Sequence, residues 1–579
     1  MNASPDSSNE ANSRIDGRLF RQFWQIAKPY WFSEQRWKAR GLLALLLIMS
    51  VVVNGLNVGI SFVFRFVDTS LAEKQADTFW RYIFIYIGIL ILGTPIVVLY
   101  GFLRDKLGRF WREWLTKDFL DRYFRNRAYY EINQNTDLDN PDQRISEDIN
   151  SFTVTSLQFL LVVLGAIITL FSFTGVLISI SLPLTATLLV YAIGGTIITT
   201  FIGKRLIAIN FNQLRREADF RYGLVHVRDN AEAIAFYQGE DRESLSVKDR
   251  FMQAIRNYDL LIGWQRNLDF FTTGYGYLVA ALPYLVVAPI YLSGQTDFGT
   301  ITQAAIAFRQ IFGALSIIVT QFEKLTAFAA GIKRLGAFRE ALDQTDMPAQ
   351  HSTIDTVNAD VLSLHHVTLQ TPNRMSTLVS DLSVELQPGD GLLIVGHSGC
   401  GKSSVLRAIA GLWNCGTGKI TRPNLEEMLF LPQRPYMVLG TLREQLLYPN
   451  VHQSVDENQL RQVLQQVNLA DLPERVGGFE AELDWANVLS LGEQQRLAIA
   501  RLLMTKPRYA ILDEATSALD WKNEALIYKI IQASQTTYIS VGHRSSLLKY
   551  HRHVLKLEHD SRWKVLPAQE YALETEVLA

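Results

Sequence analysis

Cysteine and net charge are both scarce in this chain. Its 579 residues include only two cysteines, Cys400 and Cys415, which favours a reducing compartment without a disulfide framework. Lysine and arginine total 56 while aspartate and glutamate total 57, so the formal net charge is −1. This balance lacks the basic excess that is typical of nucleic-acid-binding proteins, and we expect no nucleic-acid partner.

Apolar residues make up 48% of the chain and are concentrated in its first half. Six stretches there are long enough to cross a bilayer, which takes about 20 residues. They lie at 41–63, 82–103, 155–180, 183–202, 269–292 and 300–322. A core helix of a soluble protein is the alternative for any one stretch, and the amphipathic last stretch is the weakest case. Six in succession predict membrane spans.

Positive charge between the stretches predicts their orientation. Lysine and arginine are abundant before the first stretch and in the loops at 104–153 and 203–266. The other loops are short and poor in positive charge. Because basic loops stay on the cytoplasmic side, we expect both termini to be cytoplasmic.

The segments around the predicted spans differ in composition. Residues 1–16 are polar, which predicts a disordered tail without a cleavable signal. Residues 17–40 mix aromatic and basic side chains, typical of a helix along the membrane interface, with a packed cytoplasmic helix as the alternative. The polar segment 341–360 predicts a linker. We therefore expect a transmembrane domain over 17–340 and a second domain over 361–579.

A glycine-rich segment is the first motif of the second domain that indicates a chemical function. The apolar run 392–395 is typical of a buried strand, and the residues after Lys402 have helical periodicity. Glycines between them allow a tight turn whose amide groups face phosphate. Lys402 can reach the β and γ phosphates, and Ser403 can bind Mg²⁺, although an ordinary glycine-rich turn is the alternative. The predicted ATP-binding residues are Gly396, His397, Ser398, Gly399, Cys400, Gly401, Lys402, Ser403 and Ser404, with Gln433 beyond the loop.

A second apolar run, 509–512, precedes two acidic residues, Asp513 and Glu514. Acidic side chains at the carboxyl end of a parallel strand would lie beside the phosphate loop. We predict that Asp513 holds Mg²⁺ with Ser403 and Gln433, and that Glu514 is the general base for the attacking water. Gln433 and His543 are predicted to sense the γ-phosphate and this water. For His543 alone, a hydrogen-bonded histidine at a strand end is the alternative.

Six elements follow one another in a fixed order between Gly396 and Arg544: G-H-S-G-C-G-K-S, L-P-Q, L-S-L-G-E, Y-A-I-L-D-E, S-A-L-D and G-H-R. With these elements, the second domain resembles the nucleotide-binding domain of ABC transporters, an α/β P-loop ATPase. The resemblance implies that L-S-L-G-E caps the γ-phosphate held by a second domain. The residues implied to act in trans are Ser490, Leu491, Gly492, Glu493 and Asp520. Leu491 departs from the commoner glycine. Since each motif occurs once, the resemblance implies a homodimer with two composite ATP sites.

An aromatic residue for stacking on adenine is missing between positions 361 and 395. Many domains of the ABC family have such a residue upstream of the phosphate loop. We therefore expect apolar or proline contact near 369–372 to cover adenine.

Two segments extend the resemblance into the membrane domain, D-N-P-D-Q-R-I-S-E-D-I at 139–149 and N-A-E-A-I-A-F-Y-Q-G-E at 230–240. Together with L-P-Q-R-P-Y-M and V-L-S-L-G-E-Q-Q-R, they are similar to SbmA/BacA-related ABC proteins of the YddA kind. They are also similar to the subfamily D half-transporters of peroxisomes and lysosomes. The resemblance implies an α-helical six-span transmembrane domain of the exporter type, followed by the P-loop ATPase domain.

The same resemblance implies a function. We expect an ATP-driven transporter that uses ATP and Mg²⁺ and works by alternating access as a homodimer in a bacterial cytoplasmic membrane. A bulky hydrophilic solute, cobalamin-like or peptide-like, is the first expectation for its cargo, and an acyl-CoA or fatty acid is the second. A soluble ABC ATPase acting on ribosomes or DNA is the remote alternative, which the six predicted spans disfavour.

Polar residues recur along the last predicted span. At about 100° per residue, Thr302, Arg309, Ser316 and Thr320 fall on one stripe, with Gln310 on its flank. An arginine near mid-membrane costs at least about 2.5 kcal/mol on insertion scales, so it should face water or a partner. We expect this stripe to line a cargo cavity, with a structural ion pair or helix cap as the alternative.

Overall fold

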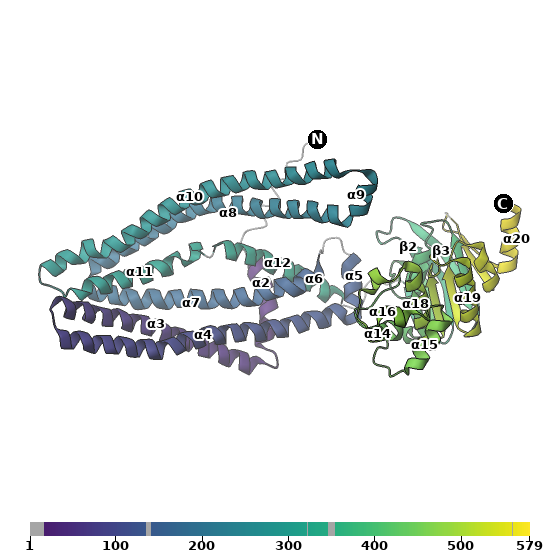
Figure 1. The fold of residues 1–579 in the computed structure, drawn as a ribbon, viewed down its shortest axis with the longest axis horizontal. Coiled ribbons are helices and arrows are strands. Elements are labelled where there is room, and N and C mark those ends of the chain that lie inside the picture. The colour runs from purple at the N-terminus through teal and green to yellow at the C-terminus, as the bar shows by residue number, and fades with distance from the viewer. Residues whose placement is uncertain (1–16, 135–139, 321, 346–353, 559, 579) are drawn as a thin grey trace. The chain divides into compact units, whose positions relative to one another are not determined.

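Two compact units make up the chain, Met1–Met347 and Pro348–Ala579 (Figure 1). The structure is a computed structural model that describes residues 17–134, 140–320, 322–345, 354–558 and 560–578. The predicted disordered tail at 1–16 lies outside the described residues.

All the regular elements described in the first unit are helices, and its long helices lie side by side (Figure 1). α3 packs against α4, α8 packs against α10, and α11 packs against both α7 and α3. The helices are α2 (Gly17–Trp31), α3 (Arg36–Ala72), α4 (Ala76–Phe124), the short η2 (Arg125–Arg127), α5 (Ala128–Gln134), α6 (Pro141–Gln143), the π-helical η3 (Arg144–Asp148), α7 (Ile149–Ile180), α8 (Leu182–Asp229), α9 (Ala231–Tyr237), α10 (Glu240–Leu292), α11 (Gly299–Thr320) and α12 (Phe322–Thr345).

Four helical segments among the described residues are long and apolar enough to cross a membrane: Arg36–Ala72, Ala76–Asn133, Pro141–Ile180 and Glu240–Leu292. They contain the spans predicted at 41–63, 82–103, 155–180 and 269–292. Apolar side chains on α4 such as Ile91 and Leu92 are exposed, which a lipid environment explains.

The remaining two predicted spans, 183–202 and 300–322, coincide with α8 and α11. Neither helix is among the four segments named above. In α11 the polar pair Arg309 and Gln310 interrupts the apolar run, and parts of both helices lie outside the described side chains. The presence of six membrane spans therefore stays a prediction.

Helix α2 has one packed face and one open face. Ile26 and Tyr30 are buried, and the Tyr30 ring stacks on Trp111 of α4 with centroids 5.7 Å apart. Phe20 and Trp24 on the open face are 68% and 47% exposed. The buried face agrees with the alternative of a packed helix. The exposed aromatic face agrees with the predicted helix along the membrane interface.

The second unit contains two sheets. Strands β10-β9-β4-β8-β7-β6 form the larger one, in which all neighbours are parallel except the antiparallel edge strand β10, and β1-β5-β2-β3 form the smaller one. The strands are β1 (Ile354–Asn358), β2 (Leu362–Gln370), β3 (Thr377–Leu386), β4 (Gly391–Gly396), β5 (Gly416–Arg422), β6 (Met428–Leu431), β7 (Tyr509–Asp513), β8 (Thr537–Val541), β9 (His553–Leu557) and β10 (Trp563–Pro567). Parallel pairing brings the carboxyl ends of β4, β7 and β8 to one edge of the larger sheet.

Helices cover the sheets of this unit and carry several of the predicted motifs. They are α13 (Lys402–Ile409), η4 (Leu425–Glu427), α14 (Leu442–Leu447), α15 (Glu457–Gln466), α16 (Leu472–Val476), α17 (Trp485–Val488), α18 (Leu491–Thr505), α19 (Trp521–Ala533), η5 (Ser545–Tyr550) and α20 (Ala568–Leu578). The predicted buried strands before the phosphate loop and before Asp513 are confirmed as β4 and β7. The predicted helix after Lys402 is confirmed as α13.

Regular structure occupies both ends of the segment predicted as a linker, 341–360. α12 continues to Thr345 because Leu342 is buried on the same helix face as Leu335 and Phe338. β1 begins at Ile354 and pairs with β5. Residues 346–353 lie outside the described residues.

Candidate functional site

The glycine-rich loop joins β4 to α13 in conformations that its glycines permit. Gly399 and Gly401 have φ of +82° and +99°, in the left-handed region. A Cβ atom at Gly401 would lie 3.2 Å from Cβ of Leu378, so close packing also favours glycine there. Lys402 is only 7% exposed, and its Nζ donates to the carbonyls of Gly396 and His397 over 2.8 and 2.9 Å. The loop therefore surrounds a fixed ammonium group.

Ser403 and Asp513 meet beside this loop. Ser403 Oγ donates to Asp513 Oδ1 over 3.4 Å, which places the end of β7 next to the start of α13. Burial raises the pKa of Asp513, and the negative charge of Glu514 raises it further, while the Ser403 hydrogen bond opposes both effects. A cation at these oxygens would favour the ionised carboxylate.

A magnesium ion fits this pair chemically. The described residues contain no cluster of three or more His, Cys, Asp or Glu side chains that could hold a metal. Mg²⁺ is usually held by one or two protein oxygens together with water and phosphate oxygens, rather than by a complete protein cage. Ser403 and Asp513 can supply those protein ligands.

Glu514 lies at the centre of a second group of polar side chains. Gln433 Nε2 donates to Glu514 Oε2 over 2.8 Å, and His543 Nε2 lies 3.4 Å from Glu514 Oε1. The backbone of Glu514 has φ of +50°, which is uncommon for a residue with a side chain. Such strained residues are concentrated at functional sites. The structure thus brings together the three predicted catalytic residues.

The residues predicted to act in trans form a different group. Ser490 is the N-cap of α18, where its Oγ accepts from the Glu493 amide and Glu493 Oε2 accepts from the Ser490 amide over 2.9 Å. Leu491 is exposed, and Gly492 lies close to the carbonyl of Ala518, where a Cβ atom would be 3.2 Å away. This capping box is compatible with a rigid, outward-facing helix N-terminus.

Asp520 has an additional local role that the sequence interpretation missed. Its Oδ1 accepts from the amides of Lys522 and Asn523 over 2.8 and 2.9 Å, which makes it the N-cap of α19. These hydrogen bonds lower its pKa. The carboxylate therefore stabilises its own chain, and its predicted action in trans stays a prediction.

The predicted adenine cover at 369–372 requires a correction. Leu369 is fully buried in the core between the sheets, because β2 includes this position and turns its side chain inward. Leu369 is therefore not available to cover a base. Pro372, two residues after the end of β2, is exposed and keeps the predicted proline contact open.

Two buried polar residues of α18 connect the predicted motifs. Gln495 Nε2 donates to the carbonyl of Gln433 over 2.9 Å, and its Oε1 accepts from the Ala518 amide over 3.0 Å. Arg501 donates to the Tyr436 carbonyl over 2.6 Å, and burial lowers its pKa to about 10. α18 thus holds the segments after β6 and after β7 in position. One signal was present in the sequence, since Gln495 shares a helix face with apolar Leu502.

An ion pair between buried Glu524 and half-exposed Arg544 anchors the residue next to His543. Arg544 donates to the carbonyls of Ser517 and Leu519 over 3.0 and 2.8 Å, and its Nη1 lies 3.2 Å from Oε1 of Glu524. Glu524 is 2% exposed and also accepts from Thr516 and Ser546. The pair therefore ties the segment after Glu514 to the segment that carries His543.

Arg544→Gln is expected to lower the free energy of unfolding of the second unit by about 2 kcal/mol. The substitution leaves the Glu524 carboxylate buried without its cation, but half-exposed Arg544 makes the loss smaller than for a fully buried pair. Thermal unfolding of the full chain in lipid nanodiscs measures the effect. Arg461→Gln, in an exposed pair with Glu474, is the matched control and should leave the midpoint nearly unchanged. Equal midpoints for the two variants would contradict the assignment.

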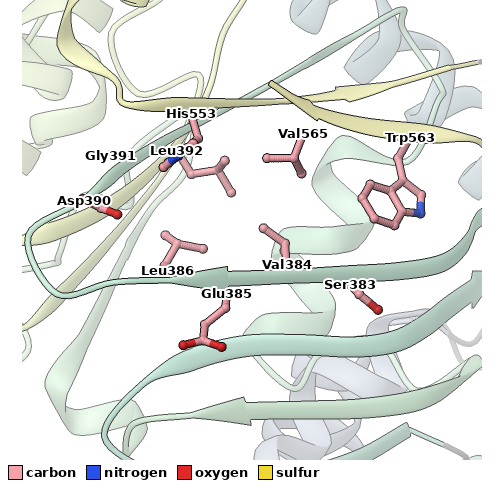
Figure 2. A pocket seen from close by; sticks show the side chains of 10 residues that line it. All are labelled: Ser383, Val384, Glu385, Leu386, Asp390, Gly391, Leu392, His553, Trp563 and Val565. Carbon is pink, nitrogen blue, oxygen red and sulfur yellow. The ribbon is translucent and has the colours of Figure 1, made fainter. Parts of the chain in front are cut away.

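A cavity of about 270 Å³ lies elsewhere in the second unit, between β3 and the strands β4, β9 and β10 (Figure 2). Figure 2 shows Val384, Leu386 and Val565 facing one another in it, with Trp563 at one side. Gly391 and Leu392 line it at the beginning of β4, whereas the phosphate loop follows the end of that strand. This cavity is therefore distinct from the predicted ATP site.

The fold and the site together define a class of protein. A P-loop domain with acidic residues at the ends of its parallel strands is joined to a helical unit with exposed apolar helices. This combination defines a membrane-associated ATPase.

Comparisons with known proteins give the family. The family described as "ABC transporter transmembrane region 2" matches residues 26–292, and the family described as "ABC transporter" matches residues 379–517. An uncharacterised ABC transporter ATP-binding protein of Synechocystis is 51% identical, over 92% of this chain and 82% of its own length. The chloroplastic ABC transporter D family member 2 of Arabidopsis thaliana is 40% identical, over 97% of this chain and 89% of its own. The lysosomal cobalamin transporter ABCD4 of Homo sapiens is 31% identical, over 97% and 99%.

The chain belongs to the ABC transporter family as a half-transporter, with one membrane domain and one ATP-binding domain, and is homologous to subfamily D. It is an ATPase coupled to membrane transport. The predicted resemblance to the YddA kind is confirmed by 28% identity to the Escherichia coli inner membrane protein YddA. The SbmA/BacA part of that resemblance stays a prediction.

Proposed function

We propose that two copies of this chain form a transporter with two shared ATP sites and work by alternating access. The observation that supports this most directly is the exposed N-terminus of α18, which carries the residues predicted to act in trans. Lys402, Ser403 and Asp513 form one group, whereas Ser490 caps the exposed end of α18. An exposed helix N-terminus favours anionic phosphate, and a two-fold dimer can bring it to the partner's loop.

Within each site, the roles follow from position. Lys402 would neutralise the β and γ phosphates, while Ser403 and Asp513 would hold Mg²⁺, with Gln433 as the third ligand predicted from the sequence. Glu514 accepts the proton of the attacking water. Gln433 and His543 orient this base through the contacts that they make to its two oxygens. Mg²⁺ supplies charge neutralisation at the phosphates when it is bound.

A bulky hydrophilic solute, cobalamin-like or peptide-like, is the cargo that we propose. The human relative is named as a lysosomal cobalamin transporter, and cobalamin is a solute of this kind. The polar stripe of α11 supports the same chemistry: Arg309 is exposed, while its neighbour Phe308 is buried against the other helices. Arg309 has no ion-pair partner within the described part of the chain, which argues against the structural alternative. Thr302 and Ser316 are partly exposed, and the side chain of Thr320 lies outside the described residues.

The membrane that fits this proposal is a bacterial cytoplasmic membrane, with both termini in the cytoplasm. Basic residues in the loops at 104–153 and 203–266 support that orientation. The ATP-binding unit follows the last helix of the membrane unit in the sequence. In the proposed orientation this unit is in the cytoplasm, where ATP is available.

Arg309→Ala is expected to abolish most cargo-stimulated ATPase activity while basal activity stays within about twofold. In the proposed cargo site the arginine contributes a charged group, and because its side chain is exposed, its removal should disturb little packing. The measurement is ATPase activity in nanodiscs with a panel of cobalamins, peptides and acyl-CoAs. Arg256→Ala, an exposed position of α10 outside the predicted spans, is the control, and Arg309→Lys should retain part of the stimulation. Full stimulation in Arg309→Ala would place the cargo elsewhere.

A further inference from the structure

Basic side chains lie over aromatic rings where α2, α3 and α4 meet. Lys38 Nζ is 3.8 Å from the centroid of the Phe110 ring, and the Arg109 guanidinium is 4.6 Å from the same centroid. Arg40 lies 4.8 Å from the Phe32 ring, and Lys106 lies 5.5 Å from the Phe102 ring. We call Phe32, Lys38, Arg40, Lys106, Arg109 and Phe110 the basic-aromatic patch.

The rings hold these cations without neutralising them. A cation over an aromatic face is attracted by the ring quadrupole and keeps its full charge. Lys38, Arg40 and Lys106 are all exposed, and Arg40 is also fixed by a hydrogen bond to the Trp31 carbonyl over 3.1 Å. The patch therefore presents positive charge in a restricted geometry.

Acidic side chains near the patch are engaged mainly with other residues. Asp105 pairs with Arg104 over 2.9 Å, and Glu113 pairs with Lys117 over 3.0 Å and more weakly with Arg109 over 3.5 Å. Among the described residues, Lys38, Arg40 and Lys106 form no ion pair within 4.0 Å, although Lys38 is also attracted by the more distant Glu113 carboxylate. The patch thus has an excess of positive charge that an anion can balance.

The position of the patch indicates where this anion comes from. Arg40 immediately precedes the predicted span 41–63, and Lys106 follows the predicted span 82–103 by three residues. α3 and α4 pack against each other, so both residues lie at the same end of this helix pair. Phe32, Trp37 and Phe102 around them are 57%, 74% and 58% exposed. Exposed aromatic rings beside basic residues are typical of the membrane–water interface.

We propose that the basic-aromatic patch binds the phosphate of an anionic phospholipid, with the exposed rings lying among the lipid glycerols. Lys38, Arg40 and Lys106 supply the charge, and Trp37 supplies contact with the acyl boundary. The bound lipid joins α2 to the ends of α3 and α4 and thereby stabilises the base of the membrane unit. This inference is independent of the cargo and of the composite ATP sites.

The test measures lipid binding to the purified full chain. The chain in detergent is titrated with phosphatidylglycerol or phosphatidylcholine, and native mass spectrometry detects the bound lipid. The triple variant Lys38→Gln, Arg40→Gln and Lys106→Gln is expected to lose at least about tenfold in phosphatidylglycerol affinity, with phosphatidylcholine binding unchanged. The matched control removes three exposed charges elsewhere on α8 and α10, in Arg221→Gln, Lys248→Gln and Arg256→Gln. The control should bind phosphatidylglycerol as the parent does.

Three outcomes would overturn the proposal. Unchanged phosphatidylglycerol affinity in the triple variant would show that the patch does not hold the headgroup. An equal loss in the control triple would indicate a general charge effect. Competition by soluble glycerol phosphate at the affinity of the lipid would assign the patch to a free phosphate compound. Thermal unfolding midpoints of all variants, measured in phosphatidylcholine nanodiscs, distinguish loss of binding from loss of folding.

Discussion

ATP hydrolysis is expected to fall by about 10²–10⁴-fold in Glu514→Gln, because the amide cannot accept a proton from the attacking water. ATP binding should survive, since Lys402 and Ser403 are unchanged and glutamine has nearly the same shape. The amide oxygen can still accept the hydrogen bond that Gln433 now donates over 2.8 Å. Hydrolysis rate and ATP affinity, measured in the same nanodisc preparation, should therefore separate. The variant should also accumulate as a closed, ATP-bound dimer.

Lys402→Ala gives the contrasting result. Its ammonium group is fixed inside the phosphate loop, so its loss should weaken ATP binding itself. A Glu514→Gln protein that hydrolyses ATP at the parental rate would show that another group is the base.

Mixing two inactive subunits is expected to restore ATPase activity. A Ser490→Arg chain keeps its phosphate loop, and a Lys402→Ala chain keeps its exposed α18 N-terminus, so a mixed dimer contains one complete composite site. In mixed dimers isolated through both tags, the activity should be about half of the parental value if the two sites act independently, because one of the two composite sites is complete. Coupled ATPase assays on co-purified, differently tagged subunits measure it.

The control for this mixture is a chain that carries both substitutions. Mixed with the Lys402→Ala chain, it supplies no intact phosphate loop and should remain inactive. An inactive Ser490→Arg and Lys402→Ala mixture, despite demonstrated pairing, would mean that each chain completes its own site.

Local patterns predicted the nucleotide region well. Buried strands before Gly396 and Asp513 and the helix after Lys402 could be predicted because each depends on a short run of residues. The proximity of Ser403 to Asp513 followed from one topological rule for parallel strands.

Long-range contacts were harder to predict. Gln495 lies 62 residues from Gln433, and Arg501 lies 65 residues from Tyr436, and no local pattern indicates such hydrogen bonds. Leu369 was misjudged because its burial depends on the pairing of β2 with β3 and β5. Asp520 was assigned only a distant role because its cap required the observed start of α19. In the membrane unit, hydropathy indicated four spans clearly, but the polar residues of α11 reduce the same signal there.

ATP-dependent transport by reconstituted protein tests the central claim most directly. Proteoliposomes with the parental chain or with Glu514→Gln would be given Mg²⁺ and ATP, and the movement of labelled cobalamin, a labelled peptide and a labelled acyl-CoA would be followed. We predict that cobalamin or the peptide crosses the membrane with the parental chain and not with Glu514→Gln. Movement of acyl-CoA alone would reassign the cargo. Parental ATP hydrolysis without movement of any of these solutes, or equal movement with Glu514→Gln, would contradict the proposed ATP-driven transport of these solutes.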